Sequence, residues 1–285
     1  MASSDLEIGR LALADLADAE AMVAEAGWNQ VAADWRIFLD FGTAYAVRSG
    51  GRVIATAATL PYGGRCAWIS MVLVSAQHRR HGLATRLLHR CISDIEASGL
   101  VPVLDATPAG ATVYAPLGFE AAWGFARLAS QRRSIGTLET DGIATQPITA
   151  DTWDALRAYD APIFGADRSD VLTRMRGRLP AANLAAQRDG RIAGMLLGRD
   201  GRTAVHLGPL IAEDDAVAKA LLATALREID GPVYIDVADA KSEVRRWLEA
   251  SGFSAQRPFT RMLLRRRESF DDGSRTYAVI GPEFG

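Results

Sequence analysis

The hydrophobic residues of the chain follow two alternating patterns, one typical of strands and one typical of helices. Apolar runs rich in strand-forming residues predict strands at 7–11, 43–48, 52–60, 66–74 and 101–106. Apolar residues spaced three and four apart predict helices at 16–26, 31–39, 83–98 and 109–117. With two further strands expected by residue 130, the first half of the chain predicts a mixed α/β sheet with helices packed on it.

The second half of the chain repeats this order of elements. Its pattern predicts a helix at 152–159, strands at 183–187 and 191–197, a strand ending at 211, a helix at 217–229 and a strand at 233–237. Val74 corresponds to Ile211, and Gly118-Phe119 corresponds to Gly252-Phe253, at nearly equal offsets. An internal repeat explains this correspondence. We therefore expect two domains, 1–135 and 145–285, divided within the polar, glycine-containing stretch 136–144.

Composition narrows the class of protein. Of the 285 residues, 49% are hydrophobic and 23% are charged, which is typical of a folded globular chain. No apolar run approaches the roughly 20 residues of a membrane-spanning helix, and the start of the chain lacks the pattern of a secretory signal. The formal net charge of −2 argues against broad nucleic-acid binding. We expect a cytoplasmic protein with no nucleic-acid or membrane partner, whose Cys66 and Cys91 are buried thiols.

The segment that joins the strand ending at Val74 to the following helix carries the most chemical information. Residues 74–85 read Val-Ser-Ala-Gln-His-Arg-Arg-His-Gly-Leu-Ala-Thr. A helix N-terminus presents N–H groups that have no intrahelical partner, together with the positive end of the helix dipole. Gly82 and Ala84 keep the approach to these groups clear. The segment predicts an anion cradle suited to a pyrophosphate, with neither the P-loop nor the three-glycine dinucleotide motif.

The pattern Arg79-x-x-Gly82-x-Ala84 after such a strand resembles the coenzyme A loop of the GCN5-related N-acetyltransferases, the GNAT superfamily. A second motif, Tyr114-Ala-Pro-Leu-Gly118-Phe119, follows where that family has a tyrosine beside the cofactor sulfur. Four further stretches, 27–30, 104–110, 164–168 and 281–285, are similar to the bacterial acetyltransferases of the YitH type. Those proteins join a GNAT acetyltransferase domain to a degenerate C-terminal one.

The resemblance implies acetyl-CoA as the cofactor and assigns its contacts. The residues expected to form the cradle are Arg79, Arg80, His81, Gly82, Leu83, Ala84 and Thr85. The main chain of Val72, Leu73 and Val74 is expected to pair with the pantetheine arm of the cofactor. Tyr114 is the implied general acid for the leaving thiolate. Trp28, Asn29 and Gln30 are expected to wall the acceptor site, and Ala76 departs from the proline that many family members have in this loop.

The sequence leaves three candidates for the general base that accepts the proton of the amine. Asp105, at the end of the fifth strand, is one candidate, although it could instead cap the following helix. The tail offers Glu283 and the carboxylate of Gly285, if residues 277–280 form a strand and Gly281-Pro282 turns the last residues towards Tyr114. A chain of water molecules with no side-chain base is the third candidate.

The second half lacks both motifs. It has Ala212-Glu213-Asp214-Asp215-Ala216 in place of the cradle, and Leu248 in place of Tyr114. Three carboxylates would repel a pyrophosphate, so we expect one active domain and one degenerate copy. The histidines share no spacing with a carboxylate or thiol, and no metal site is expected.

The implied activity is transfer of acetyl from acetyl-CoA to an amine of a small metabolite or peptide, with a homodimer left open. The alternative is a non-catalytic acyl-CoA sensor, which would keep the cradle but have no need of Tyr114.

Overall fold

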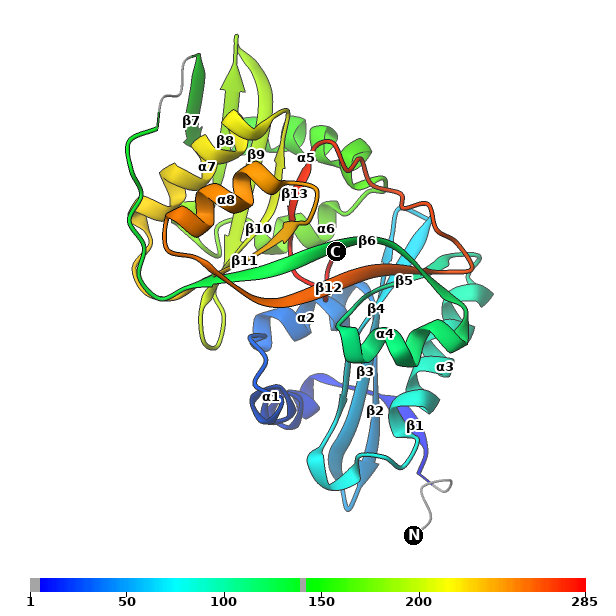
Figure 1. The fold of residues 1–285 in the computed structure, drawn as a ribbon. Coiled ribbons are helices and arrows are strands. Elements are labelled where there is room, and N and C mark those ends of the chain that lie inside the picture. Colours follow the sequence, from blue (N-terminus) through cyan, green and yellow to red (C-terminus); the bar gives the residue numbers. More distant parts are fainter. Residues whose placement is uncertain (1–5, 139–141) are drawn as a thin grey trace. The chain divides into compact units, whose positions relative to one another are not determined.

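The computed structural model describes residues 6–138 and 142–285. Two compact units make up the chain: the first extends to Leu104 and includes Phe284, and the second extends from Asp105 to Glu283 and includes Gly285 (Figure 1). This division differs from the expected one at 136–144, of which residues 139–141 lie outside the described part of the chain. No described helix has the length and apolar character needed to cross a membrane.

The first unit is a sheet in the order β1-β2-β3-β4-β5 with helices packed on it. Its elements are β1 (Ile8–Arg10), α1 (Leu16–Glu25), α2 (Ala32–Phe41), β2 (Thr43–Ser49), β3 (Arg52–Tyr62), β4 (Cys66–Val74), α3 (Leu83–Ala97) and the start of β5 (Val101–Ala106). Neighbouring strands are antiparallel except β4 and β5, which are parallel. Figure 1 shows α1 and α2 on one side of this sheet and α3 on the other. These elements confirm the predicted order, and β4 and β5 have the predicted bounds.

Helix α3 packs firmly because one of its faces is apolar. Its buried residues are Leu83, Leu87, Leu88, Cys91, Ile92 and Ile95. These positions follow the three- and four-residue spacing of a helical stripe, and the stripe lies on β3 and β4. Cys91 in this stripe is a buried free thiol, as is Cys66. Burial raises the pKa of the Cys91 thiol to about 12.

The second unit has the strand order β12-β6-β11-β13-β10-β9-β8-β7. Its elements are α4 (Pro108–Tyr114), β6 (Phe119–Ser130), β7 (Ile143–Pro147), α5 (Ala150–Phe164), α6 (Ser169–Met175), β8 (Leu184–Arg188), β9 (Arg191–Arg199), β10 (Val205–Ala212), α7 (Asp215–Glu228), β11 (Val233–Ala238), α8 (Ser242–Ala250), β12 (Ser254–Leu264) and β13 (Thr276–Val279). Its core is an apolar cluster around α7, in which Leu221 and Leu222 are fully buried.

The strand β6 belongs to the second unit. We expected two strands by residue 130, and this was wrong, because residues 119–130 form the single strand β6. β6 pairs antiparallel with β11 on one side and with β12 on the other. Its backbone hydrogen bonds therefore place it in the sheet of the second unit.

The structure supports the internal repeat. β4 pairs with β5 in parallel, and β10 pairs with β11 in parallel in the same way. Gly118 and Gly252 each precede a long strand, β6 and β12, with φ of 94° and 99°. Both glycines use the left-handed conformation that side chains disfavour, which is why glycine recurs at this point of each copy.

A group of charged side chains is buried within the sheet of the second unit. Arg127 donates two hydrogen bonds to Asp236, at 2.8 and 2.7 Å, and Nε2 of His206 lies 3.1 Å from Oδ2 of Asp236. Nδ1 of His206 lies 3.3 Å from Nη2 of Arg199, which is ion-paired with Glu283. The pairing of opposite charges offsets the cost of removing these groups from water.

Candidate active site

Strand β4 carries a bulge just before its end. Ala58 pairs with Ser70 and Thr56 pairs with Leu73, so Met71 and Val72 lie opposite Ala57 alone. Met71 has φ of 52°, a left-handed conformation that is uncommon for a residue with a side chain. A bulge leaves a residue out of the strand ladder and turns the local backbone. Val72, the first of the predicted cofactor-pairing residues, is part of this bulge, and Leu73 and Val74 follow it.

The turn between β4 and α3 is held by contacts at its beginning. The N–H of Ala76 donates a 2.5 Å hydrogen bond to the Glu25 side chain, and the Ser75 hydroxyl lies 2.8 Å from Nδ1 of His78. Nε of Arg79 donates to the carbonyl of Val74 at 3.2 Å. Glu25 and His78 were not predicted as part of the site, and no motif marks them: Glu25 contacts the backbone of the turn, and His78 contacts the side chain of Ser75.

The N-terminus of α3 is open to a ligand. The helix begins after Gly82, which has φ of 75° and provides no side-chain cap. A Cβ placed on Gly82 would meet no atom within 4 Å. The first N–H groups of a helix have no intrahelical acceptor, and here no side chain of the N-cap covers them. Gly82 is exposed, as are Arg79, Arg80 and Thr85 beside it.

These features fit a pyrophosphate. The glycine gives an anion room to approach the backbone, the helix dipole points its positive end at the same place, and the turn carries several cationic side chains. Arg80 has φ of 62°, so two residues of this short turn adopt the left-handed conformation. Residues 79–82 form the turn and residues 83–85 begin α3, and together they are the segment where the sequence predicted the cradle.

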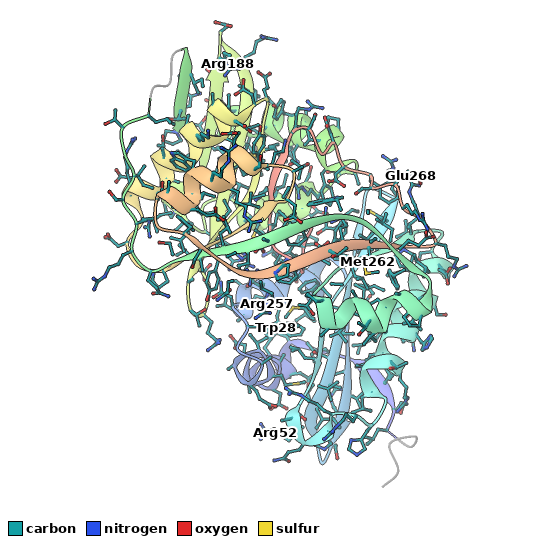
Figure 2. All side chains as sticks on the ribbon, in the orientation of Figure 1. Trp28, Arg52, Arg188, Arg257, Met262 and Glu268 are labelled. Atoms are coloured by element: carbon teal, nitrogen blue, oxygen red, sulfur yellow. The ribbon has the colours of Figure 1, made fainter. Side chains whose placement is uncertain are left out.

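The predicted acceptor-wall residues lie between α1 and α2, where Figure 2 labels Trp28. Gly27 (φ 68°) ends α1, and the N–H of Trp28 donates to the carbonyl of Val23 at 3.0 Å. Asn29 and Gln30 are buried. The side-chain oxygen Oε1 of Gln30 is buried without a hydrogen-bond partner among the described residues. An unsatisfied buried acceptor is costly, and an amine is the kind of donor that would satisfy it.

Tyr114 is the last residue of α4 in the second unit. The hydroxyl of Thr107 caps this helix by accepting from the N–H of Gly110 at 3.1 Å. A Cβ on Gly110 would lie 3.0 Å from the ring of Tyr114, so the glycine makes room for the ring. The ring of Phe119 lies 6.1 Å from that of Tyr114. Burial raises the pKa of the Tyr114 phenol, which keeps it protonated at neutral pH.

Asp105 is paired with an arginine, an arrangement that is not expected of a general base. Its two oxygens accept hydrogen bonds from Nε and Nη2 of Arg261, both at 2.9 Å, and both side chains are buried. Taking a proton would break a bidentate charge-assisted pair. Asp105 does not cap α4 either, since Thr107 does so. The geometry therefore gives Asp105 a structural role in the second unit.

The tail residues that we considered as bases are also paired. Glu283 is buried against Arg199. The oxygen of Gly285 accepts from Nη1 of Arg168 at 3.0 Å, and Arg168 also binds Asp160 through two hydrogen bonds. Phe284 belongs to the first unit, where its ring stacks on Phe38 at 5.1 Å. Each of these contacts orders the tail.

In the second unit, the turn that corresponds to residues 79–85 has a side chain at the start of its helix. Asp214 caps α7 by accepting from the N–H of Val217 at 3.0 Å. Arg188, labelled in Figure 2, donates to both oxygens of Asp214, at 2.6 and 3.2 Å. A carboxylate of the chain thus occupies the position that an anion would take at this helix.

The first unit also contains a cavity of about 380 Å³. It is lined by Thr43, Thr59 and Ala67 among others, at the end of the sheet away from Val74. It is therefore separate from the cradle.

Comparison with known proteins agrees with this geometry. Residues 12–119 match the model of the acetyltransferase (GNAT) family, and residues 156–278 match that of an acetyltransferase (GNAT) domain. The chain is 25% identical over 222 residues to the uncharacterized N-acetyltransferase YitH of Bacillus subtilis, covering 78% of each protein.

Solved structures show the same fold over nearly the whole chain. A GCN5-related N-acetyltransferase from Sphaerobacter thermophilus has a TM-score of 0.67 at 15% identity, covering 95% of this chain and 98% of that one. A tandem GNAT protein from the clavulanic acid biosynthesis pathway has a TM-score of 0.64 at 16% identity, covering 91% and 98%. With a GNAT match in each half, the chain belongs to the GNAT superfamily of acyltransferases as a tandem protein of the YitH type.

Proposed function

We propose that the protein transfers acetyl from acetyl-CoA to an amine of a small metabolite or peptide. In this proposal residues 1–135 form the catalytic domain and residues 145–285 the degenerate one. The observation that carries the proposal is the start of α3 at Gly82, an exposed helix N-terminus without a side-chain cap that follows a bulged strand.

The residues proposed to hold the cofactor are those of the turn and of the end of β4. The N–H groups at the start of α3 and the charges of Arg79 and Arg80 would bind its phosphates. The main chain of Val72 to Val74, which begins within the bulge and ends β4, would run along its pantetheine arm. When bound, the cofactor supplies an acetyl group as a reactive thioester.

Tyr114 is proposed to supply a proton to the thiolate. A phenol has an unperturbed pKa of about 10, and burial raises that of Tyr114 further. The proton is therefore present on the phenol oxygen throughout the neutral range. A thiolate with a pKa of about 8.5 is a reasonable partner for it.

The proton of the amine is proposed to leave through water. Asp105, Glu283 and the oxygen of Gly285 are each bound to an arginine, so none of them is proposed to accept the proton of the amine. Gln30 supports the amine acceptor, since its buried Oε1 can accept a hydrogen bond from the amine. Trp28 and Asn29 would complete that wall.

The experiment is an acetylation assay with acetyl-CoA and a panel of amines, with release of free thiol as the readout. At least one amine should accelerate thiol release above the background hydrolysis, and the Gly82→Asp variant should abolish that acceleration. A protein that binds acetyl-CoA tightly yet accelerates release with no amine in the panel would instead be an acyl-CoA sensor.

A further inference from the structure

In both units, the first residues of one long strand pair in parallel with the strand that follows it in the sequence. In the first, β4 pairs with β5 at Cys66–Val101, Ala67–Pro102 and Trp68–Val103, and β4 then continues to Val74. In the second, β10 pairs with β11 at Val205–Val233, His206–Tyr234 and Leu207–Ile235, and β10 then continues to Ala212. Beyond the paired residues, each longer strand has an edge that needs a partner. In the first unit, the function proposed above assigns this edge to the cofactor.

In the second unit the edge is filled by the chain itself. Strand β13 runs antiparallel to both neighbours, pairing with Leu210 of β10 and with Val237 of β11 through the same residue, Ala278 (Figure 1, red). All residues of β13 are buried, and Ala278 is only 1% exposed. β13 therefore lies between β10 and β11 as an added strand, the arrangement used in recognition by strand addition.

The neighbouring residues are shaped for this strand. A Cβ on Gly208 would lie 1.9 Å from the carbonyl oxygen of Val279, so only glycine allows β13 to pass β10 this closely. The Tyr277 hydroxyl donates to Asp215 in the first turn of α7 at 2.7 Å. The N–H of Ala212 donates to the carbonyl of Arg275 at 3.0 Å.

The phosphate end of this second site is filled as well. Asp214 takes the helix N-terminus, and Arg188 neutralises Asp214 rather than an incoming anion. Both parts of a cofactor site, the anion cradle and the strand edge, are therefore occupied by side chains and backbone of the same unit.

We propose that β13 is the permanent intramolecular occupant of the cofactor slot of the second domain, and that each chain consequently binds one coenzyme A, in the first domain. The stoichiometry rests on the proposed function. The occupation of the slot by β13 does not.

The first experiment is titration calorimetry of the full chain with coenzyme A. The expected stoichiometry is one per chain, falling to zero in Gly82→Asp and staying at one in Gly64→Asp. Gly64 is the matched control, because its φ is 68° and a Cβ there also meets nothing within 4 Å. Two bound molecules per chain, or one retained by Gly82→Asp, would overturn the proposal. A wild type that binds none would refute the proposed function.

The second experiment is hydrogen exchange of the wild-type chain, which tests the slot without relying on activity. The amides of residues 276–279 should exchange at least about a thousandfold more slowly than in an unstructured chain, as expected for a buried central strand. Saturating coenzyme A should leave this protection unchanged. Fast exchange in the free protein, or loss of protection on adding coenzyme A, would show that β13 is not the resident strand.

A variant links this protection to the slot. Gly208→Ala should speed exchange of residues 276–279 by at least about tenfold, because the new methyl would collide with Val279. Gly231→Ala is the control: Gly231 also has a positive φ, of 79° against 149° for Gly208, but with open space around it. Equal protection of β13 in both variants would count against the proposal.

Discussion

The hydroxyl of Thr56 donates a 2.8 Å hydrogen bond to the main-chain carbonyl of Met71 and so holds the bulge of β4 in place. Thr56 is fully buried on β3, opposite Leu73. The left-handed backbone of Met71 costs on the order of 1–2 kcal/mol, and this hydrogen bond helps to offset it. The geometry of the proposed cofactor strand therefore depends on a side chain of the neighbouring strand.

Replacing Thr56 by valine should consequently slow acetyl transfer. The change keeps the shape of the side chain and leaves the Met71 carbonyl without this donor, at a cost of about 1–3 kcal/mol. We expect the maximal rate to fall about tenfold, with a matching loss of stability in urea denaturation. Thr59→Val is the control, since its hydrogen bond to Thr43 is long, at 3.5 Å. Equal effects of the two variants would contradict the role of the bulge.

Gly82→Asp should abolish measurable binding of coenzyme A while the chain stays folded. Aspartate tolerates the left-handed conformation better than most residues, and the space around Gly82 is open. The new carboxylate would cap α3 and repel the pyrophosphate. Calorimetry measures the binding, and circular dichroism checks the fold. Unchanged affinity in the folded variant would refute the cradle.

Tyr114→Phe should lower the maximal rate by about ten- to a thousandfold with little change in cofactor affinity. The pKa of the phenol is raised by burial, so the acid stays protonated as pH rises through neutrality. The wild-type rate should therefore show no loss of this acid below pH of about 10. A fall near pH 8 that is absent from the phenylalanine variant would contradict this result, and a full-rate variant would remove Tyr114 as the acid.

Gln30→Leu should separate stability from acceptor binding. The variant removes a buried acceptor that has no partner among the described residues, so the free energy of unfolding should stay constant or rise. If Oε1 binds the amine, the KM for the amine should increase about tenfold or more, with unchanged affinity for coenzyme A. An unchanged KM would exclude Gln30 from the acceptor site.

Acid should destabilise the second unit in two stages. Burial lowers the pKa of His206, so stability is present above its unfolded value of about 6.5 and is lost as pH falls further. Burial alone would raise the pKa of Asp236, but Arg127 and His206 outweigh it and lower that pKa. Its contribution is therefore present above about pH 3.9 and is lost below. Urea denaturation from pH 8 to 3 should show both stages, and only the lower one in His206→Gln.

Much of the first unit could be predicted because its signals are local. The bounds of β4 and β5 follow from short apolar runs, and the start of α3 follows from a glycine before an amphipathic stripe. Each of these signals lies within about one element of the residue that it describes. The residues of the proposed cradle could be chosen from the sequence for the same reason, since they form one continuous segment that runs from the turn into the start of α3.

Contacts between distant parts of the chain could not be predicted in this way. Asp105 and Arg261 are 156 positions apart, and nothing near Asp105 indicates a buried arginine partner. An alternating strand pattern reports burial but not which strand is the neighbour. The place of the single long strand β6 in the second unit follows from its pairing with β11 and β12. The bulge at Met71 was missed because no glycine marks its backbone conformation.

Strand β13 is covalently attached beside the slot that it fills, whereas a free cofactor has to reach the slot from solution. Residues 265–275 tether it to the end of β12, so it is never diluted. A short tether holds its ligand at an effective concentration on the order of millimolar or above. The slot would thus stay filled even if mutation restored a cationic turn in place of Asp214, because a free cofactor would have to outcompete a neighbour that cannot diffuse away. A cofactor could enter this slot of the second unit only after β13 had left it.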